Sequence, residues 1–283
     1  LYSTAAITWL DQHATAAPFF LMLSMAEPHT TIENPAQYNA LYADYTNGEV
    51  VPIPSGEPTP PKNKLVPRGP GEYYANITYM DAQIGRVLDW LAGRTELNRN
   101  TVVVFASDNG PVTSNWINWW EVNAYGDTGG LRGRKHYLYE GGIKVPAIVR
   151  YPGVTQAAST SAALITGTDL FTTLVKAAGG ELPKNRTIDG ADVTDQLSGR
   201  AHAPRQLLWA LTGQLEYAFR DGDWKLLFNA ARQPQELYNL AQDPLELFNV
   251  INGEADTVVR LSHAFNRQLD AILQDPLRPV PYN

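Results

Sequence analysis

Cysteine is absent from the 283 residues of this chain. Disulfide bonds, zinc sites built on thiolates and a cysteine nucleophile are therefore excluded within these residues. Because no thiol is present, redox chemistry gives no information about the compartment in which the protein works.

A long apolar run is also missing. The longest one, around residues 19–25, is much shorter than the ~20 residues that span a bilayer. No basic segment followed by an apolar one opens the chain, as it would in a signal peptide. Residues 4–13 instead have helical spacing and lead directly into the apolar run, as in the middle of an α/β unit. We therefore expect no membrane partner, and a natural sequence that begins upstream of Leu1.

Basic residues are few and scattered. Lys and Arg number 22 against 29 Asp and Glu, which gives a formal net charge of -7. Because the sequence has no basic cluster that would follow a phosphate backbone, we expect no nucleic-acid partner. The content of 44% hydrophobic and 18% charged residues is that of a globular protein large enough to bury a core.

Apolar runs alternate with amphipathic segments in the first part of the chain. Residues 18–25 and 101–107 have the continuous apolar pattern of strands buried on both faces, and residues 141–150 predict another strand. Residues 72–91 and 169–178 have the apolar spacing of helices. The sequence therefore predicts an α/β fold with a mixed, largely parallel sheet flanked by helices.

After about residue 204 the pattern changes to short strand-like segments separated by turns. They cover residues 206–211, 217–220, 224–228 and 236–240, and a helical pattern follows over residues 256–273. We predict a small antiparallel C-terminal subdomain, in which the sheet is closed by the terminal helix. The chain is thus expected to divide into an α/β part, residues 1–204, and this subdomain, residues 205–283.

Two polar residues follow the predicted strand at residues 101–107. Asp108 and Asn109 carry adjacent carboxylate and amide oxygens, which are hard ligands suited to Ca²⁺ or Mg²⁺. The end of a strand in an open α/β sheet is also where ligands bind. The dipeptide alone is more typical of an Asx turn, so both a metal site and a local turn stay open.

His29 follows the first apolar run, within Glu27-Pro28-His29-Thr30. Its imidazole would emerge at a strand end, where a general acid could meet a substrate. A histidine in such a loop is more often a hydrogen-bonded structural residue, so this alternative also stays open.

Cations gather between glycines in residues 131–136. Arg132, Arg134 and Lys135, followed by His136, form a set suited to an oxyanion such as sulfate or phosphate. The segment is not a nucleotide-binding Walker loop, because Gly-Lys-Ser/Thr is absent. A solvated loop is the alternative interpretation.

Taken in order along the chain, these segments resemble the type I sulfatases of the alkaline phosphatase superfamily. Single motifs are weak, but the ordered set is specific and extends over most of the chain. The matching stretches are Pro18-Phe-Phe-Leu21 to Pro28-His29-Thr30, Met80-Asp81 with Ile84-Gly85-Arg86, Phe105-Ala-Ser-Asp-Asn-Gly-Pro111, Leu131-Arg-Gly-Arg-Lys135 with Tyr139-Glu-Gly-Gly-Ile-Lys-Val-Pro146, and Glu236-Leu-Tyr-Asn-Leu240 with Asp243-Pro244.

The resemblance implies roles for individual residues. Asp108 and Asn109 match the family's metal ligands, His29 its substrate-side histidine and Lys135 its sulfate-binding lysine. Arg134 and His136 flank Lys135 where the family usually has glycines. Each of these neighbours is therefore a further candidate for contact with the sulfate group.

The resemblance also implies groups that these residues do not contain. In the family, an upstream segment carries an Asp-Asp metal pair and a Cys- or Ser-x-Pro-x-Arg motif, from which a formylglycine nucleophile is made. Neither occurs in this sequence. Residues 1–204 thus resemble the C-terminal portion of a sulfatase catalytic domain. We expect the chain to be inactive alone and its missing N-terminal part to be a candidate partner.

The predicted function is a sulfuric ester hydrolase that acts on an aryl or carbohydrate sulfate, either a small molecule or a glycan, with Ca²⁺ or Mg²⁺ as cofactor. Four aromatic residues between Asn109 and Lys135 could stack on such a substrate or form part of an interface: Trp116, Trp119, Trp120 and Tyr125. Two alternatives stay open: a phosphodiesterase or phosphonate hydrolase of the same superfamily, and a noncatalytic glycan-binding remnant. The resemblance favours a periplasmic or secreted location.

Overall fold

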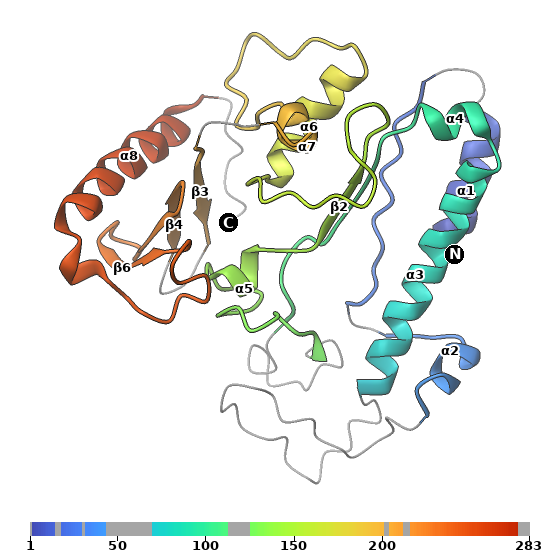
Figure 1. The fold of residues 1–283 in the computed structure, drawn as a ribbon, viewed down its shortest axis with the longest axis horizontal. Helices are drawn as coiled ribbons and strands as arrows, with labels where there is room; N and C mark the ends of the chain where they lie inside the picture. Colours follow the sequence, from blue (N-terminus) through green and yellow to red (C-terminus); the bar gives the residue numbers. More distant parts are fainter. Residues whose placement is uncertain are drawn as a thin grey trace. The chain divides into compact units, whose positions relative to one another are not determined.

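The computed structural model describes residues 2–14, 18–29, 32–43, 70–112, 125–200, 204–211 and 216–276. The chain divides into two compact units, whose helices and strands are drawn in Figure 1. The first unit contains residues 1–101 and 111–127, and the second contains residues 102–110 and 128–283. The division predicted near residue 204 falls inside the second unit and stays a prediction.

Helices make up the regular structure described in the first unit. They are α1 (Tyr2–His13), α2 (Ala36–Ala40), α3 (Pro70–Ala92) and α4 (Thr95–Arg99). The helix predicted at residues 72–91 is confirmed, and it begins at a proline, whose fixed φ suits the first helical turn.

Polar contacts join α1 to α3. Ser3 Oγ donates to Gln83 Oε1 at 2.5 Å, and Trp90 Nε1 donates to Asp11 Oδ1 at 2.7 Å. Figure 1 shows the two helices side by side. The N-terminal helical spacing in the sequence therefore produces a helix that packs on the longest helix of this unit.

The strand predicted at residues 18–25 is not formed. Exposure alternates along this segment, and the side chains of Phe20 and Met22 are 71% and 76% exposed. A strand needs hydrogen bonds to a neighbour, and within the described residues this segment pairs with none. The continuous apolar pattern predicted burial on both faces, which the alternating exposure contradicts, and it gave no information about a pairing partner.

The second unit contains a pair of strands, β1 (Val103–Ala106) and β2 (Ala147–Arg150). They pair antiparallel, with Val104 opposite Val149. The α/β class is confirmed, but all strand pairs among the described residues are antiparallel, so the predicted parallel order is not found there. A parallel crossover usually carries a helix within a dozen or more residues. The helix described between β1 and β2, α5 (Glu140–Ile143), has only 4 residues, and it replaces the first half of the strand predicted at residues 141–150.

Helix α6 (Gly167–Ala177) confirms the helix predicted at residues 169–178, and the short helix α7 (Thr194–Leu197) follows it. Thr166 and Asp169 form a capping box at the start of α6. Asp169 is fully buried and also receives two hydrogen bonds from Arg205, at 2.6 and 2.7 Å.

The C-terminal part forms the predicted antiparallel sheet with its terminal helix. The sheet has the order β3–β4–β5–β6, and the prediction is confirmed nearly residue for residue. Its elements are β3 (Gln206–Ala210), β4 (Tyr217–Asp221), β5 (Trp224–Phe228), β6 (Pro234–Asn239), the short 3₁₀ helix η3 (Ile251–Gly253) and α8 (Ala255–Gln274).

Both faces of this sheet are covered. On one face, Leu226 and Phe228 pack against Phe265 of α8. On the other face, Leu227 and Tyr238 pack with Leu138 and its neighbour Tyr139. Because successive side chains of a strand point to opposite faces, β5 contributes to both clusters. The segment that carries the predicted cation site is therefore packed on the C-terminal sheet.

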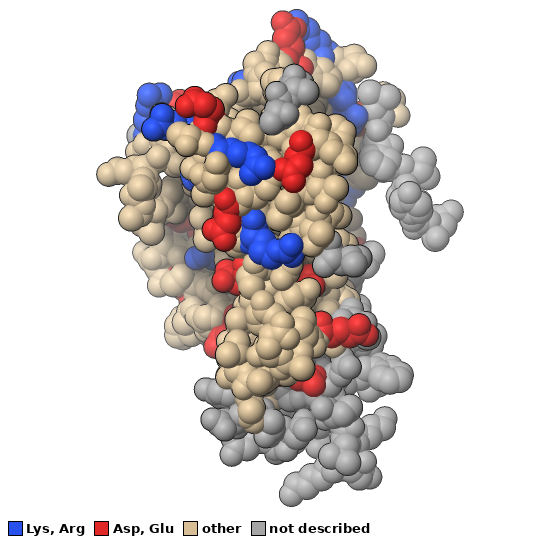
Figure 2. All heavy atoms as spheres, turned by 90° about the vertical axis from the view of Figure 1, so that its right-hand side faces the viewer, with Lys and Arg blue, Asp and Glu red and all other residues tan. Residues whose placement is uncertain are grey.

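None of the helices among the described residues combines the length and the apolar character needed to cross a bilayer. Figure 2 shows Lys and Arg side chains interspersed with Asp and Glu over the described residues of one face. This pattern agrees with the scattered charges of the sequence.

Candidate functional site

The Asp108–Asn109 dipeptide forms a turn directly after β1. Asp108 is exposed, and its Oδ1 accepts the backbone N–H of Asn109 at 2.9 Å. Ser107 Oγ donates to the carbonyl of Asn109 at 2.9 Å. The dipeptide is thus held by local hydrogen bonds but not by the two-residue bond of an Asx turn, and the carboxylate stands on the surface, where a metal ion can reach it.

Arg134, Lys135 and His136 lie in a β-turn closed by a hydrogen bond of 2.9 Å from Tyr137 N to the carbonyl of Arg134. His136 has a φ of 74°, in the left-handed region that favours glycine. A positive φ at the third position is typical of a type II turn. The geometry therefore favours glycine at this position, and it shows that His136 occupies a strained backbone conformation.

The glycine pair Gly141–Gly142 contacts both turns. Gly110 N donates to the carbonyl of Gly142 at 2.9 Å, and a Cβ on Gly110 would lie 1.9 Å from the carbonyl oxygen of Gly141. On the other side, a Cβ on Gly142 would lie 2.2 Å from Tyr137 O and 2.5 Å from Arg134 O. The absence of side chains therefore lets the Asp108–Asn109 turn and the Lys135 turn lie on either side of one backbone.

The charge of the Lys135 turn is carried by Arg134 and Lys135. All three side chains of the turn are half-buried. Burial, and then the charge of Lys135, lower the pKa of His136 below its ordinary value. His136 is therefore neutral at neutral pH and does not act as a fixed cation there.

His29 lies in the first unit, whereas the other candidate residues lie in the second. Its backbone N–H donates to the carbonyl of Ala26 at 2.8 Å, and its side chain is exposed. The described structure thus brings Asp108, Asn109 and the Lys135 turn together around one glycine pair. Its relation to His29 stays a prediction.

The oxygen atoms of Asp108 and Asn109 are the type of ligand that a hard divalent cation prefers, but two residues are too few to complete its coordination. Calcium takes six to eight oxygen ligands. Among the described residues, no group of three or more His, Cys, Asp or Glu side chains is arranged to hold a metal ion. These two residues therefore supply at most part of a coordination shell.

The sequence interpretation missed a buried ion cluster, which consists of Glu140, Lys225 and Glu246. Lys225 Nζ lies 3.0 Å from Glu140 Oε1 and 2.8 Å from Glu246 Oε1, and both Lys225 and Glu246 are fully buried. A signal was present, because a lysine inside the apolar segment Trp224–Phe228 requires a charged partner if the strand is buried.

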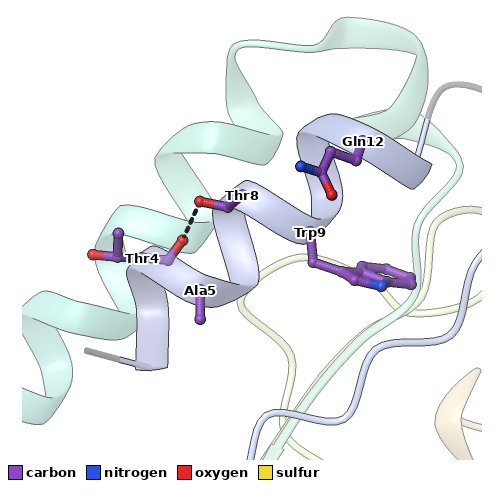
Figure 3. A pocket seen from close by; sticks show the side chains of 5 residues that line it. All are labelled: Thr4, Ala5, Thr8, Trp9 and Gln12. Atoms are coloured by element: carbon purple, nitrogen blue, oxygen red, sulfur yellow. Dashed lines mark hydrogen bonds between the residues drawn. The ribbon is translucent and has the colours of Figure 1, made fainter.

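Two hollows among the described residues are lined by residues other than the candidates. An open hollow of about 610 Å³ is lined by Thr4, Thr8 and Trp9 of α1 with two neighbours (Figure 3). A smaller one of about 340 Å³ lies between the end of α6 and α7. Trp116, Trp119 and Trp120 lie outside the described residues.

Two family models match the chain. The model described as Sulfatase matches residues 2–180, and the model described as N-sulphoglucosamine sulphohydrolase, C-terminal, matches residues 133–275. The chain is 29% identical over 217 residues to arylsulfatase G of Rattus norvegicus, an alignment that covers 74% of this chain and 35% of the relative. The chain thus spans about a third of the length of this relative.

Solved structures support the same fold. Ps i-CgsB in complex with k-i-k-neocarrahexaose matches with a TM-score of 0.74 and 21% identity, over 94% of this chain and 53% of that one. A protein solved in complex with its substrate D-Glucosamine-2-N, 6-O-disulfate matches with a TM-score of 0.53 and 25% identity, over 71% of this chain and 40% of that one. The ordered motifs, the fold and the match of the Sulfatase model to residues 2–180 show that this chain belongs to the sulfatase family.

Proposed function

We propose that this chain is part of an enzyme that hydrolyses sulfate esters with the help of a divalent metal ion. The observation that carries the proposal is the contact of Gly141 and Gly142 with both the Asp108–Asn109 turn and the Lys135 turn. These turns hold hard oxygen ligands and a fixed cation, the two kinds of group that stabilise a sulfuryl group in transfer. Membership of the sulfatase family supports this assignment.

Asp108 and Asn109 would hold Ca²⁺ or Mg²⁺, and the metal would neutralise negative charge on the sulfuryl oxygens. The exposed Asp108 carboxylate is the stronger ligand of the two because it carries a full charge. The remaining ligands would come from residues other than this pair.

Lys135 would place its ammonium group at the sulfate oxygens, with Arg134 as a second cation in the same turn. His136 would contact the sulfate as a neutral hydrogen-bonding group, because its pKa is lowered. His29 would donate a proton to the alkoxide that leaves the sulfur.

Formylglycine supplies the nucleophile in this family. The present residues contain neither a cysteine nor a Ser-x-Pro-x-Arg sequence from which it could be made. The nucleophile would therefore be contributed by residues outside this sequence, and the isolated chain would have no turnover.

An aryl or carbohydrate sulfate is the proposed substrate class. One similar protein was solved with the substrate D-Glucosamine-2-N, 6-O-disulfate, which supports a sulfated sugar. Binding would depend on contacts between the sulfate group and the Lys135 turn. Further contacts would select the alcohol part of the substrate.

The test uses the full natural polypeptide that contains these residues. We expect hydrolysis of an activated aryl sulfate in preference to an aryl phosphodiester, and a loss of about 10²- to 10³-fold in kcat for Lys135→Ala. Lys184→Ala is the matched control, because the Lys184 side chain is 85% exposed. A preference for the phosphodiester, or a rate unaffected by Lys135→Ala, would contradict the proposal.

A further inference from the structure

The Lys135 turn is held from both sides by polar contacts to the C-terminal sheet and to Glu246 in the segment that follows β6. On the side that follows the turn, the backbone N–H of Glu140 donates to Glu246 Oε2 at 2.6 Å, and the Glu140 carboxylate pairs with Lys225 of β5. These contacts belong to the buried ion cluster. They fix the backbone three residues after Tyr137, where the turn closes.

A second set of contacts, the Arg132 network, holds the side that precedes the turn. Arg132 Nη1 donates to Tyr238 Oη at 2.6 Å and to the backbone carbonyl of Glu246 at 3.0 Å, and lies 3.4 Å from Glu236 Oε2. The guanidinium also lies over the ring of Tyr139, 3.9 Å from its centroid.

The two sides are joined to each other as well. Gly141 N donates to the carbonyl of Arg132 at 2.7 Å, and Tyr139 Oη donates to Glu236 Oε2 at 2.9 Å. The turn thus lies between Arg132 and the segment at residues 139–141. The backbones of these two parts are hydrogen-bonded to each other, and the side chains of Arg132 and Tyr139 are hydrogen-bonded to β6.

The energetics of buried ion pairs favour a role in geometry over a net gain in stability relative to apolar residues. A buried ion pair is often no more stabilising than apolar residues of the same volume, because desolvation offsets the Coulomb attraction. Its hydrogen bonds nevertheless permit only one placement of the groups that they join, since any other leaves buried charges unpaired. In this chain the groups so joined are the backbone beside the Lys135 turn and the strands of the sheet.

We propose that the ion cluster and the Arg132 network position the Lys135 turn for sulfate binding, so that Arg132 and Glu246 are positioning residues supplied from outside the turn. This proposal rests on the proposed function of Lys135. It assigns to the C-terminal sheet a role in the affinity for the sulfate group, although none of the sheet residues in these contacts is proposed to touch the substrate.

The first test measures binding of inorganic sulfate to the full natural polypeptide. We expect Glu246→Gln and Arg132→Gln to weaken sulfate binding by about tenfold to a hundredfold, the range typical of losing a group that orients a site. Arg132→Lys keeps the charge and a donor, and should recover most of the affinity. Asp169→Asn is the matched control, because it breaks the buried pair with Arg205 without touching the Lys135 turn.

A second measurement, amide hydrogen exchange in the same variants, does not require a ligand. Glu246→Gln and Arg132→Gln should speed the exchange of the Tyr137 and Gly141 amides, which close the turn and join its two sides. Asp169→Asn should leave both amides as protected as in the unmodified protein.

The two measurements separate this proposal from the proposed function. Unchanged amide exchange and unchanged sulfate binding in Glu246→Gln and Arg132→Gln would overturn the positioning role. So would an Asp169→Asn variant that has the same loss of melting temperature and changes exchange and sulfate binding as much as these two variants do. If sulfate binds to no variant, the proposed function fails, whereas faster exchange of Tyr137 in Glu246→Gln alone would still support positioning of the turn.

Discussion

Lys225 and Glu246 form an ion pair of 2.8 Å while both side chains are fully buried. Lys225 belongs to β5, and Glu246 lies in the segment between β6 and η3. Burial raises the pKa of Glu246 above its ordinary value, although the charge and hydrogen bond of Lys225 partly oppose this change. Lys225 therefore opposes the effect of burial on this carboxyl.

Lys225→Met should lower the free energy of unfolding by about 3–5 kcal/mol, because it leaves the Glu246 carboxylate buried without a cation and leaves Glu140 with only Arg220, at 3.7 Å. Lys184→Met removes a lysine whose pair with Glu181 is exposed, and should change it by less than about 0.5 kcal/mol. Urea unfolding of both variants checks the difference. Equal losses would show that the ion cluster is not coupled to the stability of the fold.

Asp169 provides a prediction for the dependence of stability on pH. Burial alone would raise the pKa of this carboxyl, but hydrogen bonds from Arg205 and from the backbone of Thr166 and Ala191 lower it below its ordinary value. A lowered pKa in the folded state stabilises the fold above the pKa of the unfolded state, near pH 4. This contribution is lost as the pH falls through the folded-state pKa.

Asp169→Asn should therefore be much less stable than the unmodified protein at pH 7, and the difference should shrink as the pH falls below about 4. Thermal unfolding from pH 7 to pH 3 measures it. A difference that stays constant over this range would show that the ionised carboxylate does not account for the effect.

Asp108→Ala should reduce the content of bound Ca²⁺ or Mg²⁺ in the full natural polypeptide without unfolding it, because the carboxylate is exposed and is the proposed charged ligand. Elemental analysis after dialysis, together with circular dichroism, tests both parts. Asp89→Ala, which removes an exposed carboxylate of α3, is the control. Normal metal content in Asp108→Ala would reject the assignment of this residue as a ligand.

Gly110→Ala should destabilise the protein by about 1–3 kcal/mol, because its Cβ would lie 1.9 Å from the Gly141 carbonyl oxygen. The turn must then move away from α5, so metal content should fall as well. Gly167→Ala introduces a Cβ into open space at the start of α6, and should raise stability by roughly 0.4–1 kcal/mol. A Gly110→Ala variant as stable as Gly167→Ala would refute the close approach of the two backbones.

Local pattern alone predicted much of the fold. The short strand-like segments and the turns between them after residue 204 predicted β3 to β6 nearly to the residue, since an antiparallel meander is joined by short turns that are visible in the sequence. Helical spacing likewise predicted α3, α6 and α8. The order of the family motifs identified the candidate residues and the family, because residue identity and order are properties of the sequence itself.

Pairing and burial were decided only by the tertiary structure. The apolar run at residues 18–25 did not become a strand, and β1 and β2 paired antiparallel, because a pairing partner depends on distant parts of the chain. The partners of the buried lysine could not be identified for the same reason: Glu140 and Lys225 are 85 positions apart, and only the packed sheet brings them within 3.0 Å. The sequence therefore determined which side chains could carry the chemistry, whereas long-range packing determined which of them meet and which groups hold them in place.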